Sequence, residues 1–147
     1  MALVTGGVSG LGLATAILFK AEGATVVVAD VNEELGKQVS DEHGLEFMRL
    51  DVSDETSCKE VISEVISKYG TIHILVNSAG IIRSSLTLSR KGVLDTEQFR
   101  TIMKINLFGT VYCSAHAAFQ MSKNEPGDKG ERGVIINVSS VAAFEGQ

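Results

Sequence analysis

A glycine-rich turn near the start of the chain combines residue types that could hold a phosphate. The stretch ALVTGGVSGLGLATA places Gly6, Gly10 and Gly12 between an apolar run and a helical pattern, as T-G-x-x-x-G-x-G. The first glycine gives the backbone freedom to turn, and a diphosphate can approach closely only where no Cβ intervenes. The helix that follows would offer unpaired N–H groups and a partial positive charge. A plain tight turn remains open as the alternative.

Asp30 strengthens the nucleotide interpretation. It ends the next apolar run, near the spacing after the glycine turn at which an acid receives the adenosine ribose hydroxyls. A carboxylate there repels a 2′-phosphate, and neither Val8 nor Ser9 supplies a positive charge, so the pattern favours NAD over NADP. Asp30 could instead be a solvated strand-end residue or a cap for the helix at Asn32.

The elements that would position these residues alternate along the chain. The patterns predict strands at Ala2–Thr5, Ala24–Asp30, Glu46–Asp51, Ile72–Asn77 and Val134–Val138, and helices at Gly10–Glu22, Asn32–His43, Glu55–Tyr69 and Asp95 to about Gln120. Continuous Val and Ile strands separated by helices indicate one doubly wound, parallel α/β domain over residues 1–147. A fold of this class serves many functions.

Signals at the ends of these elements fix several boundaries. Asp54 can cap the helix from Glu55 and Gly70 can close it, while Asp95 with Gln98 forms a capping-box pattern. Ser122–Gly133 contains the only proline and is predicted to be a surface loop. The last strand then runs into Ser139 and Ser140, at the edge where open α/β sheets bind ligands.

Composition excludes several other functions. A net charge of −5 would repel a phosphate backbone, so nucleic acid is not expected as a ligand. No apolar run is long enough for a membrane helix, and a strand expected from Ala2 argues against a signal or transit peptide. The three histidines form no metal-binding pattern, so no metal is expected. The two cysteines, Cys58 and Cys113, are expected in the core.

Five segments in order resemble the short-chain dehydrogenase/reductase family: TGGVSGLG, LDVSD, NSAGI, KINLFGT and IINVSS. Ser78 departs from the family's N-N-A-G segment, where a second asparagine stands. The resemblance implies a Rossmann-like fold, a small-molecule substrate, and catalytic roles for Ser140, which would bind the substrate oxygen, and Asn106, which would hold a water. The implied cofactor-binding residues are Gly6, Ser9, Gly10, Leu11, Gly12, Asp30, Asp51, Val52, Asn77, Ser78, Ala79 and Gly80.

Within the family, KNEPGDKGERGVIIN and SVAAFEGQ look most like the 3-hydroxyacyl-CoA dehydrogenase type-2 group, also called 17β-hydroxysteroid dehydrogenase type 10. The Arg83–Thr96 segment resembles an insertion of that group. The resemblance implies hydride transfer between NAD and a secondary alcohol or ketone, with a 3-hydroxyacyl-CoA or a hydroxysteroid as the substrate class. It also implies a homo-oligomer, a tetramer at full length, and a mitochondrial location, with a cytoplasmic one otherwise.

The family's proton-transfer pair, a tyrosine followed three residues later by a lysine, is expected beyond Gln147. Tyr69 and Tyr112 stand on earlier elements, and neither has a lysine three residues on. We therefore expect a C-terminally incomplete sheet with an exposed apolar edge at Val134–Val138, and no catalysis by the 147-residue chain alone. A non-catalytic NAD-binding or interaction protein is the alternative. A methyltransferase of related fold is disfavoured by the NSAG and NVSS segments.

Overall fold

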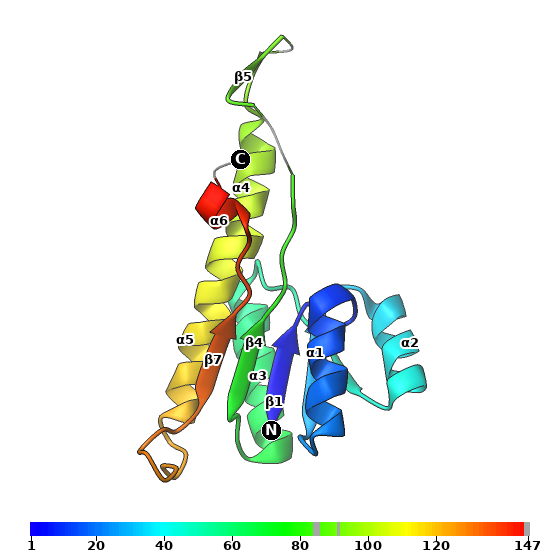
Figure 1. Cartoon of the computed structure of the whole chain (residues 1–147), viewed down its shortest axis with the longest axis vertical. Coiled ribbons are helices and arrows are strands. Elements are labelled where there is room, and N and C mark those ends of the chain that lie inside the picture. Colours follow the sequence, from blue (N-terminus) through cyan, green and yellow to red (C-terminus); the bar gives the residue numbers. More distant parts are fainter. Residues whose placement is uncertain (84–85, 91, 146–147) are drawn as a thin grey trace.

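The structure is a computed structural model that describes residues 1–83, 86–90 and 92–145. Strands and helices alternate along most of the chain, as Figure 1 shows. The strands are β1 (Ala2–Thr5), β2 (Val26–Asp30), β3 (Glu46–Arg49), β4 (Ile74–Asn77), β5 (Leu88–Ser89), β6 (Gly92–Val93) and β7 (Val134–Asn137). The helices are α1 (Gly10–Ala21), α2 (Glu33–His43), α3 (Glu55–Tyr69), α4 (Thr96–Ile102), the π-helix η1 (Met103–Gly109), α5 (Thr110–Met121) and α6 (Ala142–Glu145).

Five strands form one parallel sheet in the order β3-β2-β1-β4-β7. The order reverses at β1, where the chain passes from the β2–β3 side of the sheet to the β4–β7 side. This arrangement confirms the predicted doubly wound, Rossmann-like fold. In such sheets, ligands bind outside the carboxyl ends of the strands next to the reversal, here the ends of β1 and β4.

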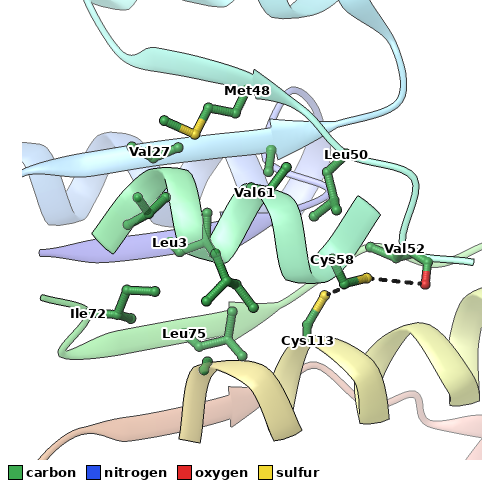
Figure 2. Close-up of a cluster of buried hydrophobic side chains, with 14 of the residues drawn as sticks. Leu3, Val27, Met48, Leu50, Val52, Cys58, Val61, Ile72, Leu75 and Cys113 are labelled. Atoms are coloured by element: carbon green, nitrogen blue, oxygen red, sulfur yellow. Dashed lines mark hydrogen bonds between the residues drawn. The ribbon is translucent and has the colours of Figure 1, made fainter. Parts of the chain in front are cut away.

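Helices cover the two faces of this sheet unequally. On one face, α3 and α5 pack against a cluster that includes Leu3, Val27 and Leu75 (Figure 2). On the other face, α1 and α2 cover a second cluster built on Val4, Val28 and neighbouring apolar side chains. The apolar residues of each strand therefore face one of two separate cores, as expected for strands buried on both sides.

The edge strand β7 has only one covered face. Ile135 packs against the cluster beneath α3 and α5. Val134 and Ile136 pair with Ile74 and Val76 of β4, so they lie on the α1–α2 face, where they are 48% and 42% exposed. Val138, just past the strand, is also exposed. The exposed apolar edge predicted for this segment is confirmed for the described residues.

Most predicted boundaries hold within one or two residues, and the predicted caps form. Asp54 accepts a hydrogen bond from the Thr56 amide, Asp95 accepts from the Glu97 and Gln98 amides, and Gly70 closes α3 in the left-handed conformation. The long helix predicted from Asp95 to about Gln120 is confirmed as a helical segment without a gap, in which α4, η1 and α5 follow one another, and seven residues in its middle wind as a π-helix. The strand predicted at Glu46–Asp51 ends at Arg49, since Asp51 accepts two hydrogen bonds from Ser53 in a local turn.

The Arg83–Thr96 segment contains the short antiparallel pair β5–β6, which projects beyond α4 in Figure 1. Residues 84, 85 and 91 of this segment lie outside the described residues, as do residues 146 and 147 at the end of SVAAFEGQ. Over the described part of the chain, every helix is too short or too polar to cross a membrane.

Candidate functional site

A cleft of about 460 Å³ lies at the carboxyl edge of the sheet, where the strand order reverses. Its walls come from the glycine turn, the ends of β2 and β3, the segment after β4, the π-helix and the end of β7. The lining residues are Gly6, Ser9, Gly10, Leu11, Ala29, Asp30, Val31, Leu50, Asp51, Val52, Ser78, Ala79, Gly80, Ile81, Ile105 and Val138. Ten of the fourteen residues expected in the site therefore line one cavity, and the others lie beneath or beside it.

The glycine turn is shaped by close backbone approaches. Gly6 has a φ of +64°, and a Cβ there would lie 2.7 Å from the Cα and N of Ala79. A Cβ at Gly12 would lie 2.2 Å from the Gly6 carbonyl oxygen, so Gly12 sits behind the cleft and lets α1 pack against the turn. Gly10, at φ +51°, has open space where its Cβ would be. The turn thus presents bare backbone and the start of α1 to the cavity, as a diphosphate would require.

Thr5 fixes the segment after β4 next to the glycine turn. This buried side chain at the end of β1 accepts hydrogen bonds from the amides of Ser78 and Ala79, at 3.2 and 3.3 Å. The β4 segment is therefore fixed against Gly6 by a polar contact across the sheet. Sequence reasoning did not assign Thr5 to the site, although its place directly before the glycines was a usable signal.

Two carboxylates stand on the β2–β3 side of the cleft. Asp30 Oδ1 accepts a hydrogen bond from the Asn32 amide at 3.0 Å, and Asn32 itself caps α2 through the Leu35 amide. Asp30 is therefore not the cap of that helix. Asp51 Oδ1 accepts from the Ser53 amide and hydroxyl. Each of these bonds uses Oδ1 alone, and both carboxylates border the cavity.

Asn106 lies in η1 and binds the segment after β4 through both ends of its amide. Its Nδ2 donates to the Ile81 carbonyl, and its Oδ1 accepts from the Ile81 amide, each at 2.9 Å. The side chain therefore fixes the wall that carries Gly80 and Ile81. A water held by Asn106 stays a prediction, and in this arrangement the side-chain amide is already occupied by Ile81.

Asn77 lies beneath the cleft instead of lining it. It is buried at the end of β4, where its Nδ2 donates to Asn137 Oδ1 at 2.8 Å and to Ser114 Oγ at 3.0 Å. Its Oδ1 has no partner among the described residues. Asn77 thus links β4 to β7 and α5, and direct contact with a cofactor stays a prediction.

Ser140 stands beyond the end of β7, exposed and outside the cavity lining. Its Oγ accepts a hydrogen bond from the Ala142 amide at 3.2 Å, which begins the short helix α6. Val138, two residues earlier, does line the cleft. The segment after β7 therefore leads from the cleft, at Val138, to Ser140 at the expected edge of the sheet.

Six lining residues were not expected from the sequence: Ala29, Val31, Leu50, Ile81, Ile105 and Val138. All six are apolar and directly adjoin or lie close to predicted site residues. Apolar side chains at strand ends carry no distinctive pattern, so their position required the three-dimensional arrangement. The described residues contain no group of three or more His, Cys, Asp or Glu side chains that could hold a metal.

Comparison with known proteins gives the family. The profile of the short chain dehydrogenase family matches residues 1–147. The chain therefore belongs to the short-chain dehydrogenase family, whose members are oxidoreductases that generally bind NAD(P).

Several curated relatives carry the name that the sequence motifs suggested. The chain is 40% identical to 3-hydroxyacyl-CoA dehydrogenase type-2 from Bos taurus and from Homo sapiens, in each case over all of this chain and 58% of the relative. It is 37% identical to the 3-oxoacyl-[acyl-carrier-protein] reductase FabG of Thermotoga maritima, over 98% of this chain and 56% of the relative. The chain thus spans a little over half the length of these proteins.

Solved structures agree on the fold. A crystal structure described as ribose-5-phosphate isomerase from Brucella melitensis 16M is 33% identical, with a TM-score of 0.83 over 98% of this chain and 52% of its own. The structure of gox2181 is 24% identical, with a TM-score of 0.85 over 99% of this chain and 55% of its own.

Proposed function

We propose that the cleft binds NAD, and that the protein to which it belongs transfers a hydride between NAD and a secondary alcohol or ketone. The observation that carries the proposal is that Asp30 and the glycine turn line one cavity. The described lining contains no Lys or Arg, so nothing there would favour a 2′-phosphate.

The residues of the cleft fit the parts of a dinucleotide. The backbone of the glycine turn and the start of α1 would hold the diphosphate, because Gly10 leaves open space and α1 offers its N–H groups. Asp30 would accept the ribose hydroxyls through Oδ2, while Asp51 and Val52 would border the adenine. The cofactor would supply the hydride acceptor or donor.

The substrate class follows from the relatives. A 3-hydroxyacyl-CoA or a hydroxysteroid is the proposed substrate, supported by 40% identity to proteins named 3-hydroxyacyl-CoA dehydrogenase type-2. Ser140 would donate its hydroxyl proton in a hydrogen bond to the substrate oxygen, which gains negative charge as a ketone is reduced. Exposed apolar side chains on α4, η1 and α5, including Phe99, Leu107 and Phe119, support a homo-oligomer at full length.

Calorimetry with NAD and NADP tests the cofactor assignment. We expect tighter binding of NAD, and we expect Asp30→Ala to narrow the difference by about 1.5–3 kcal/mol, because a charge-assisted hydrogen bond is lost. Asp41→Ala, an exposed acid on α2, is the matched control and should leave the preference unchanged. Equal or tighter NADP binding by the unsubstituted protein would overturn the NAD assignment.

The alternative is that residues 1–147 by themselves bind NAD without catalysing turnover. Neither described tyrosine lines the cleft. The Tyr69 hydroxyl donates to Glu46 at the start of β3, at the opposite edge of the sheet, and Tyr112 lies on α5 next to Phe108. A missing general acid/base typically costs about 10²–10⁴-fold in rate. We therefore expect no measurable NAD-linked oxidation by purified 1–147, and robust turnover would refute this alternative.

A further inference from the structure

The two cysteines of the chain meet in the core, far apart in sequence and from different helices. Cys58 lies on α3 and Cys113 on α5, both almost completely buried. Their sulfur atoms are 3.5 Å apart, and Cys113 donates the hydrogen bond between them (Figure 2). The chain contains only two cysteines, so each is the other's sole thiol neighbour.

The pair also adjoins the cleft wall. Cys58 Sγ donates to the Val52 carbonyl oxygen at 3.6 Å, and Val52 lines the cavity. Both cysteines belong to a buried, largely apolar cluster that also contains Val61 and Leu50 (Figure 2). Packing of α3 against α5 therefore holds the two thiols together in a fixed arrangement, which favours a reaction between them over reaction with other molecules.

We propose that Cys58 and Cys113 form a thiol–disulfide site, in which oxidation by a small peroxide links α3 covalently to α5. Bond formation requires the sulfurs to approach from 3.5 Å to a bonding distance of about 2.05 Å. The bond would close a loop across a sequence separation of 55 residues.

The two thiols are suited to different parts of the reaction. Accepting the hydrogen bond from Cys113 lowers the pKa of Cys58, against the effect of burial, whereas donating that bond and being buried both raise the pKa of Cys113. Cys58 is therefore the sulfur that attacks, and Cys113 keeps its proton.

The steps balance with hydrogen peroxide as the oxidant. The Cys58 thiolate attacks one peroxide oxygen, the O–O bond breaks, and the departing hydroxide takes up the proton that Cys58 released. Cys113 sulfur then attacks the Cys58 sulfenic acid, the S–O bond breaks, and the Cys113 proton leaves with the hydroxyl group as water. Two thiols and one peroxide give one disulfide and two waters. Local opening of the core would admit the peroxide.

The test exposes the folded, purified protein to hydrogen peroxide, removes the peroxide, and then labels remaining thiols with iodoacetamide in denaturant. We expect neither cysteine to be labelled, the protein mass to fall by two hydrogens, and a cross-linked peptide to contain Cys58 and Cys113. Dithiothreitol should restore both labels. Thermal unfolding should shift upward by roughly 5–10 °C on oxidation, because the unfolded chain becomes constrained.

Cys58→Ala and Cys113→Ala are the matched controls, and either suffices if the other fails to fold. Peroxide should not raise the unfolding temperature of either variant, and an equal rise in a variant would overturn the proposal. It would equally be overturned if both cysteines of the peroxide-treated protein are still labelled by iodoacetamide in denaturant. Loss of thiols through disulfides between molecules, or through oxygen addition without a cross-link, would also contradict it.

Discussion

The cleft has two ends that are held in different ways. At the β1–α1 end, the Gly6 backbone lies against Ala79, and Thr5 binds the amides of Ser78 and Ala79. At the β7 end, Ser140 is exposed. Its hydroxyl oxygen accepts a hydrogen bond from the Ala142 amide at the start of α6. Among the described residues, the β1–α1 end is therefore held by long-range contacts, whereas the hydrogen bond of the Ser140 side chain is a local one.

The two ends also differ in the strands beneath them. All four residues of β1 are at most 1% exposed, because helices cover both faces of the sheet there. On β7, the face that carries Val134 and Ile136 is open. A side chain at a strand end is held rigidly only where the strand itself is covered, so we expect the β1–α1 end of the cleft to be more rigid than the β7 end.

The largest expected effect compares two apolar residues on neighbouring strands. Leu75→Ala on β4 removes a fully buried side chain and should cost about 2–5 kcal/mol of unfolding free energy. Ile136→Ala on β7, where the side chain is 42% exposed, should cost less than about 1 kcal/mol. Chemical denaturation measures both. Equal costs would mean that the outer face of β7 is covered in solution, which a concentration series would reveal as self-association.

A second comparison, of two glycines with positive φ, separates the cost of a steric clash at the new Cβ from the cost of the backbone conformation. Gly6→Ala should destabilise the protein by about 2–4 kcal/mol and abolish nucleotide binding, because the new methyl group would press on the Ala79 backbone. Gly23→Ala is the control: its φ is +85°, but nothing lies within 4 Å of the new atom, so about 1 kcal/mol is expected. A mild effect at Gly6 would show that the turn relaxes away from the β4 segment.

The smallest expected effect concerns the two serines at the open end. In a protein that joins these residues to the family's Tyr-x-x-x-Lys segment, Ser140→Ala should lower turnover of a secondary alcohol by roughly 10²-fold and leave NAD affinity nearly unchanged. Ser139→Ala should be mild, because alternate residues of a strand point to opposite faces. If Ser139→Ala is instead the damaging substitution, the assignment of the motif is out of register by one residue.

Sequence patterns predicted the parts of the site that depend on local chemistry. The glycine turn requires particular backbone conformations at Gly6 and Gly10, and Asp30 ends a strand two residues before the helix cap Asn32, so both could be recognised from neighbouring residues. The parallel direction of the strands was predicted from the alternation of strands and helices, whereas the strand order β3-β2-β1-β4-β7 came from the structure.

Contacts between residues far apart in the sequence could not be predicted from such local patterns. Thr5 binds residues 73 and 74 positions later, and the Asn106 amide binds Ile81 across 25 positions. The burial of Asn77 beneath the cleft depends on Ser114 and Asn137, which come from α5 and β7. No local spacing distinguishes these residues from ordinary strand-end or helix residues, so only the folded arrangement assigns them.

The π-helix η1 sets the directions in which side chains point along the helical segment formed by α4, η1 and α5. A π-helix adds a residue to each hydrogen-bonded loop, so side chains after it point in directions different from those of an unbroken α-helix. Before the end of η1, Asn106 is directed at Ile81, and after it Cys113, Ala117 and Met121 face the sheet core. Removing one residue from Met103–Gly109 would rotate one of these sets out of phase by about 100°. The length of this segment is therefore as strictly constrained as any side chain within it.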